Sequence, residues 1–241
     1  MRLNEGIVDN GWDQSADAWI ASMGDAGDWG RQHVLDPAML ERISARRFER
    51  ALDVGCGEGR FCRKLKAMQV PAIGVDPTPT LLARARTLDP SGEYHLASAE
   101  ALPFPDASFD LVVSYLTLID IADFRTGLKQ MVRVLKADGT LLIANLNSFI
   151  TSRPMGWVRD SDGRDLHYAV DRYLEEFPEW VEWSAIRVEN WHRPLSSYMR
   201  ELIAHGLTLT FFDEPPPRSG DLEHQRRYCR APWFMVMEWR R

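Results

Sequence analysis

The stretch LDVGCGEGRF, residues 52–61, most constrains the fold, because three glycines follow directly on an apolar run. A glycine-rich turn lets the backbone approach a ligand closely. A dinucleotide-binding fingerprint needs a third glycine at position 60, where this chain has Arg60, and a phosphate-binding P-loop needs a terminal GK[ST] that is absent. The turn therefore matches neither motif.

The charges in this turn favour a cationic ligand. Asp53 and Glu58 are interleaved with Gly55, Gly57 and Gly59. Each pair of like charges would repel a pyrophosphate by about 1 kcal/mol even in a high dielectric, and by more where water is scarce. A ligand that carries ammonium and sulfonium groups would be attracted instead.

Strands and helices alternate between residues 51 and 146. Strands are predicted at 51–54, 72–76, 93–98, 109–114 and 140–146, and helices at 61–68, 80–88 and 124–136. In the last helix Leu128, Met131, Val132 and Leu135 share one apolar face, and Lys136-Ala-Asp-Gly139 is expected to end it. This alternation indicates an α/β fold with a parallel sheet covered by helices on both faces. Ligands of such sheets bind at the carboxyl ends of the strands, where the glycine turn lies.

The remaining chain divides into three parts. Residues 1–48 are predicted to be a helical lid, with Asp36-Pro37 as the cap and first-turn proline of its second helix. Residues 147–193 are expected to be an irregular, inserted lid over the acceptor. Residues 194–241 are expected to add a helix (195–206) and strands (207–213 and 232–239) that complete the sheet. Residues 51–146 are the predicted cofactor-binding core, and the whole chain 1–241 is predicted to be one domain.

The order of motifs resembles the class I S-adenosylmethionine-dependent methyltransferases, in the type 11 branch that is similar to ubiquinone and menaquinone biosynthesis enzymes. The segments that carry the resemblance are the glycine turn, GVDPT (74–78), ASAEALPFPDASFDLVVS (97–114) and VLKADGTLLIANL (134–146). The resemblance implies a Rossmann-like fold whose last strand is antiparallel, and S-adenosylmethionine as the cofactor, with S-adenosylhomocysteine as the product.

The resemblance also implies which residues bind the cofactor. Asp76 is expected to accept hydrogen bonds from the ribose hydroxyls, and Ser98 stands where the family usually has an aspartate that contacts adenine. Trp12 and Trp19 are expected to close over the sulfonium, where aromatic faces are favourable, although they could equally anchor a helix against the sheet. Arg31 is expected to pair with the carboxylate of the cofactor, although it could equally be a surface arginine. The full predicted set is Trp12, Trp19, Arg31, Asp53, Gly55, Cys56, Gly57, Gly59, Asp76, Pro77, Thr78, Ser98, Ala99, Glu100, Ser114 and Tyr115.

The catalytic group is less defined, because Ile119-Asp120 replaces a His-His pair that many relatives carry. Candidates for a general base are Asp120, which could instead cap a helix, and the histidines His33 and His192, since a histidine suits proton removal near neutral pH. Most tryptophans lie outside 51–146, which fits either an apolar acceptor pocket or the core of a lid. The predicted acceptor-binding residues are Trp29, Tyr115, Trp157, His167, Tyr168, Trp191 and His192.

Composition limits the partners. The formal net charge of −6 argues against nucleic acid, and the longest apolar run, LVVSYLTLI (111–119), is too short to span a bilayer. Three cysteines without paired spacing, and a polar N-terminus, favour a reduced, cytoplasmic protein. No metal-ligand cluster is recognisable.

We expect a monomer or homodimer that methylates an oxygen or nitrogen atom of a small, planar or aromatic metabolite, in secondary-metabolite or cofactor biosynthesis. The alternatives are an RNA or protein methyltransferase, a non-catalytic S-adenosylmethionine-binding regulator and a nicotinamide oxidoreductase.

Overall fold

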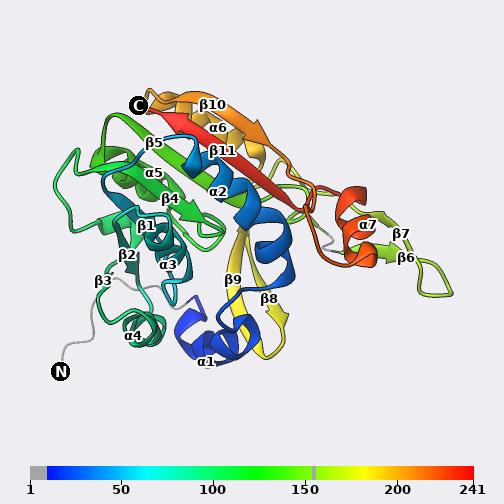
Figure 1. Cartoon of the computed structure of the whole chain (residues 1–241). Helices are drawn as coiled ribbons and strands as arrows, with labels where there is room; N and C mark the ends of the chain where they lie inside the picture. Colours follow the sequence, from blue (N-terminus) through cyan, green and yellow to red (C-terminus); the bar gives the residue numbers. More distant parts are fainter. Residues whose placement is uncertain (1–9, 154–155) are drawn as a thin grey trace.

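The computed structural model describes residues 10–153 and 156–241, and a seven-stranded sheet runs through its centre (Figure 1). The strand order is β10-β11-β5-β4-β1-β2-β3. Strands β1 to β5 pair in parallel, whereas β11 is antiparallel to both β5 and β10. The predicted parallel sheet with an antiparallel last strand is therefore confirmed. The strands are β1 (Ala51–Val54), β2 (Ala72–Asp76), β3 (Glu93–Leu96), β4 (Phe109–Tyr115), β5 (Leu135–Leu146), β10 (Thr208–Asp213) and β11 (Phe234–Arg240).

Helices cover both faces of the sheet. Side chains along each strand point alternately to the two faces, and apolar side chains on both faces must be buried. Leu52 and Val54 pack with residues of α5 and α6, whereas Ala51 and Leu111 pack with residues of α2 and α3. The helices are α1 (Trp12–Met23), the π-helix η1 (Arg31–Leu35), α2 (Asp36–Ser44), α3 (Arg60–Ala67), α4 (Pro79–Leu88), the 3₁₀ helix η2 (Ala99–Ala101), α5 (Phe124–Val134), α6 (Leu195–Ala204) and α7 (Leu222–Arg230).

Helix α5 forms on the predicted apolar face but ends earlier than predicted. Leu128, Met131 and Val132 are buried, and the Asp123 carboxylate caps the first turn by accepting a hydrogen bond from the Thr126 N–H. The helix stops at Val134 because Leu135 already pairs with Phe109 as the first residue of β5. The predicted helix end at 136–139 was therefore wrong, and this stretch is an irregular start of the strand.

The segment 147–193 is more regular than predicted, since it contains two antiparallel hairpins. One joins β6 (Trp157–Arg159) to β7 (Asp165–Tyr168), and the other joins β8 (Phe177–Trp183) to β9 (Ile186–His192). Ile186 and Val188 of β9 are buried against α1, at the period-two spacing of a half-buried strand. The second hairpin therefore ties the N-terminal helix to the body of the molecule (Figure 1).

Asp36 does not cap α2, which corrects the predicted role of this residue. Helical backbone precedes it, because η1 runs directly into α2. Pro37 lacks an N–H and cannot continue the regular hydrogen-bond ladder, which fits the wider turn at this point. The buried Asp36 carboxylate instead lies 2.8 Å from Arg60 Nη1 and accepts a 2.9 Å hydrogen bond from the Tyr115 hydroxyl.

Helix α7 has no counterpart among the predicted elements. It begins after Asp221, whose side chain accepts a hydrogen bond from the His224 N–H. Six of its nine residues are charged or polar, so the sequence gives little sign of a packed helix, and none of its residues is fully buried. In Figure 1 it lies beside the β6–β7 hairpin, and its Tyr228 packs on Phe234 at the start of β11.

Candidate active site

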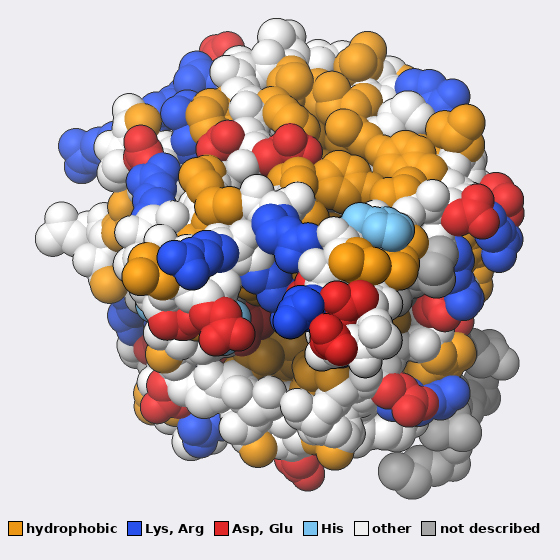
Figure 2. Space-filling model, turned by 90° about the vertical axis from the view of Figure 1, so that its right-hand side faces the viewer, with side chains coloured by type: hydrophobic (Ala, Val, Ile, Leu, Met, Phe, Trp, Pro, Cys, Tyr) orange, Lys and Arg blue, Asp and Glu red, His pale blue; other side chains and the backbone are white. Residues whose placement is uncertain are grey.

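A cavity of about 570 Å³ opens at the carboxyl ends of β1, β2, β3 and β4. Its walls come from the loops after these strands, from α1, from β8 and β9, and from α7 and the start of β11. Figure 2 shows the face that carries α7 and the β6–β7 hairpin, where charged side chains border a recess with a hydrophobic floor. The cavity thus occupies the place at which the sheet architecture predicts a ligand.

The glycine turn forms one wall of the cavity and needs its glycines. Gly55 and Gly57 have φ angles of +75° and +54°, which side chains rarely adopt. A Cβ atom on Gly55 would lie 2.2 Å from Thr117 Cγ2. The Gly57 and Thr78 N–H groups donate hydrogen bonds of 2.8 and 2.9 Å to the two carboxylate oxygens of Asp76. Asp76 therefore holds the turns after β1 and β2 together.

The acids around this turn are buried and lie close to one another. Burial raises the pKa of Asp53 to about 7 and also raises the pKa of Asp76. Asp53 Oδ1 has no hydrogen-bond partner among the described residues. A wall with an unpaired carboxylate oxygen suits a ligand that brings hydrogen-bond donors or positive charge, as an aminoacyl nucleoside with a sulfonium does.

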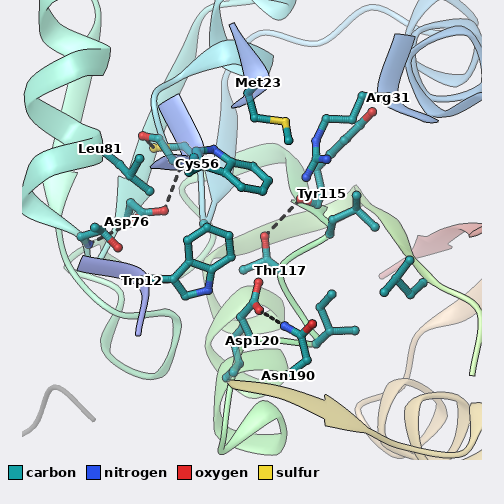
Figure 3. A pocket seen from close by; sticks show the side chains of 18 of the residues that line it. Trp12, Met23, Arg31, Cys56, Asp76, Leu81, Tyr115, Thr117, Asp120 and Asn190 are labelled. Atoms are coloured by element: carbon teal, nitrogen blue, oxygen red, sulfur yellow. Dashed lines mark hydrogen bonds between the residues drawn. The ribbon is translucent and has the colours of Figure 1, made fainter. Parts of the chain in front are cut away.

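Helix α1 brings aromatic side chains, and η1 brings a cation, to the same space (Figure 3). The rings of Trp12 and Trp19 meet edge to face at 4.9 Å, and Trp19 Nε1 donates a 3.2 Å hydrogen bond to Glu58. The Arg31 guanidinium lies 4.9 Å from the centre of the Trp19 ring and pairs with Asp28. Arg31 is thus a cation whose partner could be exchanged for a ligand carboxylate.

Asp120 faces the cavity from the loop after β4. Its Oδ1 atom accepts a 2.6 Å hydrogen bond from Asn190 Nδ2 (Figure 3). Burial, with a smaller contribution from the Asp76 charge, raises the pKa of Asp120 to about 8. A carboxyl group with a raised pKa beside an open cavity is a candidate acid or base. Asn190 has no signal in the sequence, because a contact between β9 and the β4–α5 loop depends on the fold.

The structure brings most of the predicted cofactor residues together around the cavity. Those that line it are Trp12, Trp19, Arg31, Asp53, Gly55, Cys56, Gly57, Asp76, Pro77, Thr78, Ser98, Ala99, Glu100 and Tyr115. Gly59 and Ser114 are not among the lining residues. Gly59 precedes α3 with a φ of +73° and packs closely on Tyr94, and the Ser114 side chain is fully buried.

The two candidate histidines lie outside the cavity lining. His192 is 1% exposed, and its ring nitrogens bond to the Thr151 hydroxyl at 2.8 Å and to the Tyr173 carbonyl at 3.0 Å. Burial lowers the pKa of His192. His33 packs on Trp29, and its Nδ1 atom lies 2.8 Å from the Ser219 hydroxyl. Asp120 is therefore the one predicted base that the described cavity wall contains.

The predicted acceptor residues divide in a similar way. Tyr115 and Tyr168 line the cavity, whereas Trp29, Trp157, His167, Trp191 and His192 do not. Trp157 packs on Tyr168 from behind, at 5.6 Å between ring centres. The apolar wall is instead completed by residues that the prediction did not include, among them Leu116, Ile119, Ile121, Leu146, Ile150, Tyr228, Trp233 and Phe234.

Comparisons with known proteins identify the fold and motifs. Residues 52–143 match the family model described as a methyltransferase domain. A solved S-adenosylmethionine-dependent methyltransferase from Mesorhizobium loti superposes with a TM-score of 0.75 at 27% identity, over 85% of this chain and 96% of that one. The chain therefore contains a methyltransferase domain with the fold of S-adenosylmethionine-dependent methyltransferases. A domain of this kind implies S-adenosylmethionine as the cofactor, in agreement with the acidic glycine turn.

Curated relatives of this methyltransferase match over a shorter length. The malonyl-[acyl-carrier protein] O-methyltransferase of Enterobacter lignolyticus is 33% identical over 45% of this chain and 43% of the relative. The O-methyltransferase cnsE of Penicillium expansum is 37% identical over 44% of this chain and 41% of the relative. The chain thus aligns with less than half the length of these relatives.

The described residues lack both a membrane-spanning helix and a cluster of metal ligands. Within 10–153 and 156–241, every helix is too short or too polar to cross a bilayer. The same ranges contain no group of three or more histidine, cysteine, aspartate or glutamate side chains placed to hold a metal ion.

Proposed function

We propose that this methyltransferase transfers a methyl group from S-adenosylmethionine to an oxygen or nitrogen atom of a small, planar or aromatic metabolite. The observation that carries the proposal is a single cavity that joins the acidic glycine turn, the Asp120 carboxyl and an aromatic wall. A binding site of this kind, largely apolar with a few polar groups, is typical for a small molecule.

The cofactor half of the cavity offers a partner for each part of S-adenosylmethionine. In the proposed arrangement Asp76 binds the ribose, Ser98 and Ala99 contact the adenine, and Arg31 pairs with the carboxylate. The backbone of Gly55 and of Tyr115 lies beside the amino acid part. When bound, S-adenosylmethionine supplies an electrophilic methyl group on a sulfonium and leaves as S-adenosylhomocysteine.

The acceptor half is apolar and aromatic. Leu146, Ile150, Tyr168, Trp233 and Phe234 line it from four separate stretches of the chain. The Tyr168 hydroxyl is already used, since it donates a 3.0 Å hydrogen bond to the Ile150 carbonyl. A wall of rings with few free polar groups favours a flat, uncharged acceptor.

Asp120 is the proposed base. Methyl transfer needs the acceptor and the methyl group in line, with water excluded, for which the tryptophans of α1 and β8 form a cover. An attacking hydroxyl must also lose its proton, and the Asp120 carboxylate accepts it. Since the pKa of Asp120 is raised to about 8, kcat/KM should increase with pH and level off above about pH 8.

The names of the two curated relatives favour oxygen over nitrogen as the acceptor atom, because both are O-methyltransferases. The proposal includes a cytoplasmic location, supported by the free thiols of Cys56, Cys62 and Cys229. It also includes a small-molecule partner rather than nucleic acid, supported by the net charge of −6.

The test is incubation with methyl-labelled S-adenosylmethionine and a panel of planar phenols, aromatic amines, RNA and protein fractions. We expect label to move to a phenol or an aromatic amine and to stay with the cofactor in the Asp120→Asn variant. Label on RNA or protein alone would replace the proposal with the macromolecular alternative. Tight binding of S-adenosylhomocysteine without transfer to any fraction would indicate a regulator.

A further inference from the structure

The end of β9 holds the loop that carries Asp120 through a set of contacts. Asn190 donates its side-chain hydrogen bond to Asp120 at 2.6 Å, and the next residue, Trp191, donates its backbone N–H to the Ile119 carbonyl at 2.6 Å. Arg193 then donates to the carbonyls of Leu118, Ile121 and Ala122 at 2.9, 2.7 and 2.9 Å. Each residue from 118 to 122 is therefore bonded to the segment Asn190–Arg193, which we call the β9 clamp.

Arg193 is unusual because it is buried and bonds to backbone carbonyls rather than to a carboxylate. Its side chain is 1% exposed, and its guanidinium lies 4.4 Å from the centre of the Phe124 ring and 4.8 Å from that of Trp191. Arginine presents its donors in a rigid, planar fork, so three fixed carbonyls define its position and it defines theirs. A buried cation of this kind is costly unless its hydrogen bonds are made.

His192, between these residues, fixes the other side of the clamp. Its ring bonds to Thr151 and to the Tyr173 carbonyl, which belong to the chain between β5 and β8. The side chains of Asn190 and His192 lie on one side of the strand and that of Trp191 lies on the other, as expected for alternating residues. The clamp is thus anchored to the chain between β5 and β8 as well as to the loop after β4.

We propose that Asn190 and Arg193 are positioning residues, which set the direction and the surroundings of the Asp120 carboxyl for methyl transfer. The inference rests on the proposed function, because it takes Asp120 to be the base. Neither residue needs to touch the cofactor or the acceptor for this role. Asn190 acts on the carboxyl directly, and Arg193 acts through the backbone of the loop.

Other groups also face Asp120 and must stay constant in a test. Trp12 of α1 lines the same cavity, and the charges of Asp76 at the end of β2 and of Arg31 in η1 act on the Asp120 carboxyl. None of these is part of the β9 clamp. Substitutions at Asn190 and Arg193 therefore change the clamp while leaving these neighbours in the chain.

The experiment measures the titration of Asp120 by ¹³C NMR in aspartate-labelled full-length protein, with the signal assigned from the Asp120→Asn variant. Asn190→Leu removes the donor but keeps the volume, so the pKa of Asp120 should rise by about half a pH unit or more. Arg193→Lys loses the fork and loosens the loop, so water should enter and the pKa should fall toward the ordinary value of about 3.9.

Arg133→Lys is the matched control, because Arg133 also donates to two backbone carbonyls, those of Leu102 and Phe104 at 2.9 and 2.7 Å, in a different loop. It should leave the Asp120 titration unchanged. All variants should bind S-adenosylhomocysteine, measured by calorimetry, within about twofold of the wild type, since the groups that surround the glycine turn are intact.

An unchanged Asp120 titration in folded Asn190→Leu protein would overturn the proposal, and so would a shift of equal size in Arg133→Lys. If Arg193→Lys fails to fold, the Asn190→Leu result decides. The titration needs no acceptor, so it separates the two proposals: shifted titrations without methyl transfer to any substrate would reject the proposed function only. Methyl transfer with unshifted titrations would reject the clamp only.

Discussion

The two halves of the cavity are built differently. The cofactor half comes from the loops after consecutive parallel strands, and its polar contacts, such as Gly57 to Asp76, join neighbouring turns of the sheet. The acceptor half is assembled from Leu146, Ile150, Tyr168 and Trp233, which lie in segments of different structure. The cofactor half is therefore local and charged, whereas the acceptor half is dispersed and aromatic, and changes in one should leave the other intact.

The largest expected effect is on the cofactor half. Gly55→Ala should reduce the affinity for S-adenosylhomocysteine by about 100-fold or more, because a φ of +75° is strained with a Cβ that would lie 2.2 Å from Thr117. Calorimetry measures the affinity. Gly206→Ala is the control, since its φ of +78° gives the same strain in open space. Equal losses in both variants would attribute the effect to general destabilisation.

Asp76→Ala should have the next largest effect, a loss of affinity of about tenfold or more, since it removes the acceptor of the Gly57 and Thr78 N–H groups and of the proposed ribose contacts. Asp89→Ala is matched to it, because Asp89 is also a buried acid but bonds to Lys66 away from the cavity. Wild-type affinity in Asp76→Ala would contradict the assignment of the cofactor half.

A substitution in the acceptor half should weaken the binding of a planar phenol without changing the affinity for the cofactor product. Trp233→Ala should weaken the binding of 2-naphthol, followed by its fluorescence, by about fivefold, because a ring that lines the cavity is lost. Affinity for S-adenosylhomocysteine should stay within about twofold. Trp180→Ala, at a tryptophan that is 40% exposed and outside the lining, is expected to change neither. A parallel loss of both ligands in Trp233→Ala would break the division into halves.

The smallest expected effect is on stability at the junction of the halves. Since the pKa of Asp120 is about 8 when folded, its contribution to stability is fully present below the unfolded value of about 3.9 and is lost as the pH rises through 8. The Asp120→Asn variant does not lose stability in this way, because its amide does not ionise. Its Tm should therefore exceed that of the wild type by an amount that grows between pH 4 and 8, by about 2–4 °C for each kcal/mol that ionisation of the buried carboxyl costs.

Thermal scans at several pH values measure this difference. Asp25→Asn, at a side chain that is 75% exposed, should show no such trend. A Tm difference for Asp120→Asn that does not depend on pH would contradict the raised pKa.

The contrast between the halves also explains what the sequence could predict. Strands β1 and β2 and most of the cofactor residues follow from short motifs, because each motif contains both the strand and the turn that ends it. Asn190, Trp233 and Phe234 could not be found this way, since they reach the cavity only once the hairpin and the last strand have packed. Asp36 was misjudged for the same reason: its sequence neighbour Pro37 suggests a cap, but its partner Arg60 is distant in the chain.

The buried Asp36–Arg60 ion pair bears on how the protein can be shortened. The segment 52–143, which matches the family model, contains Arg60 but not Asp36. An excised fragment of that extent would lose the carboxylate partner of Arg60, and it would expose the apolar sheet residues Leu111 and Val113, which α2 covers. Truncation series and split-protein designs for this chain should therefore keep η1 and α2 covalently or non-covalently associated with the sheet.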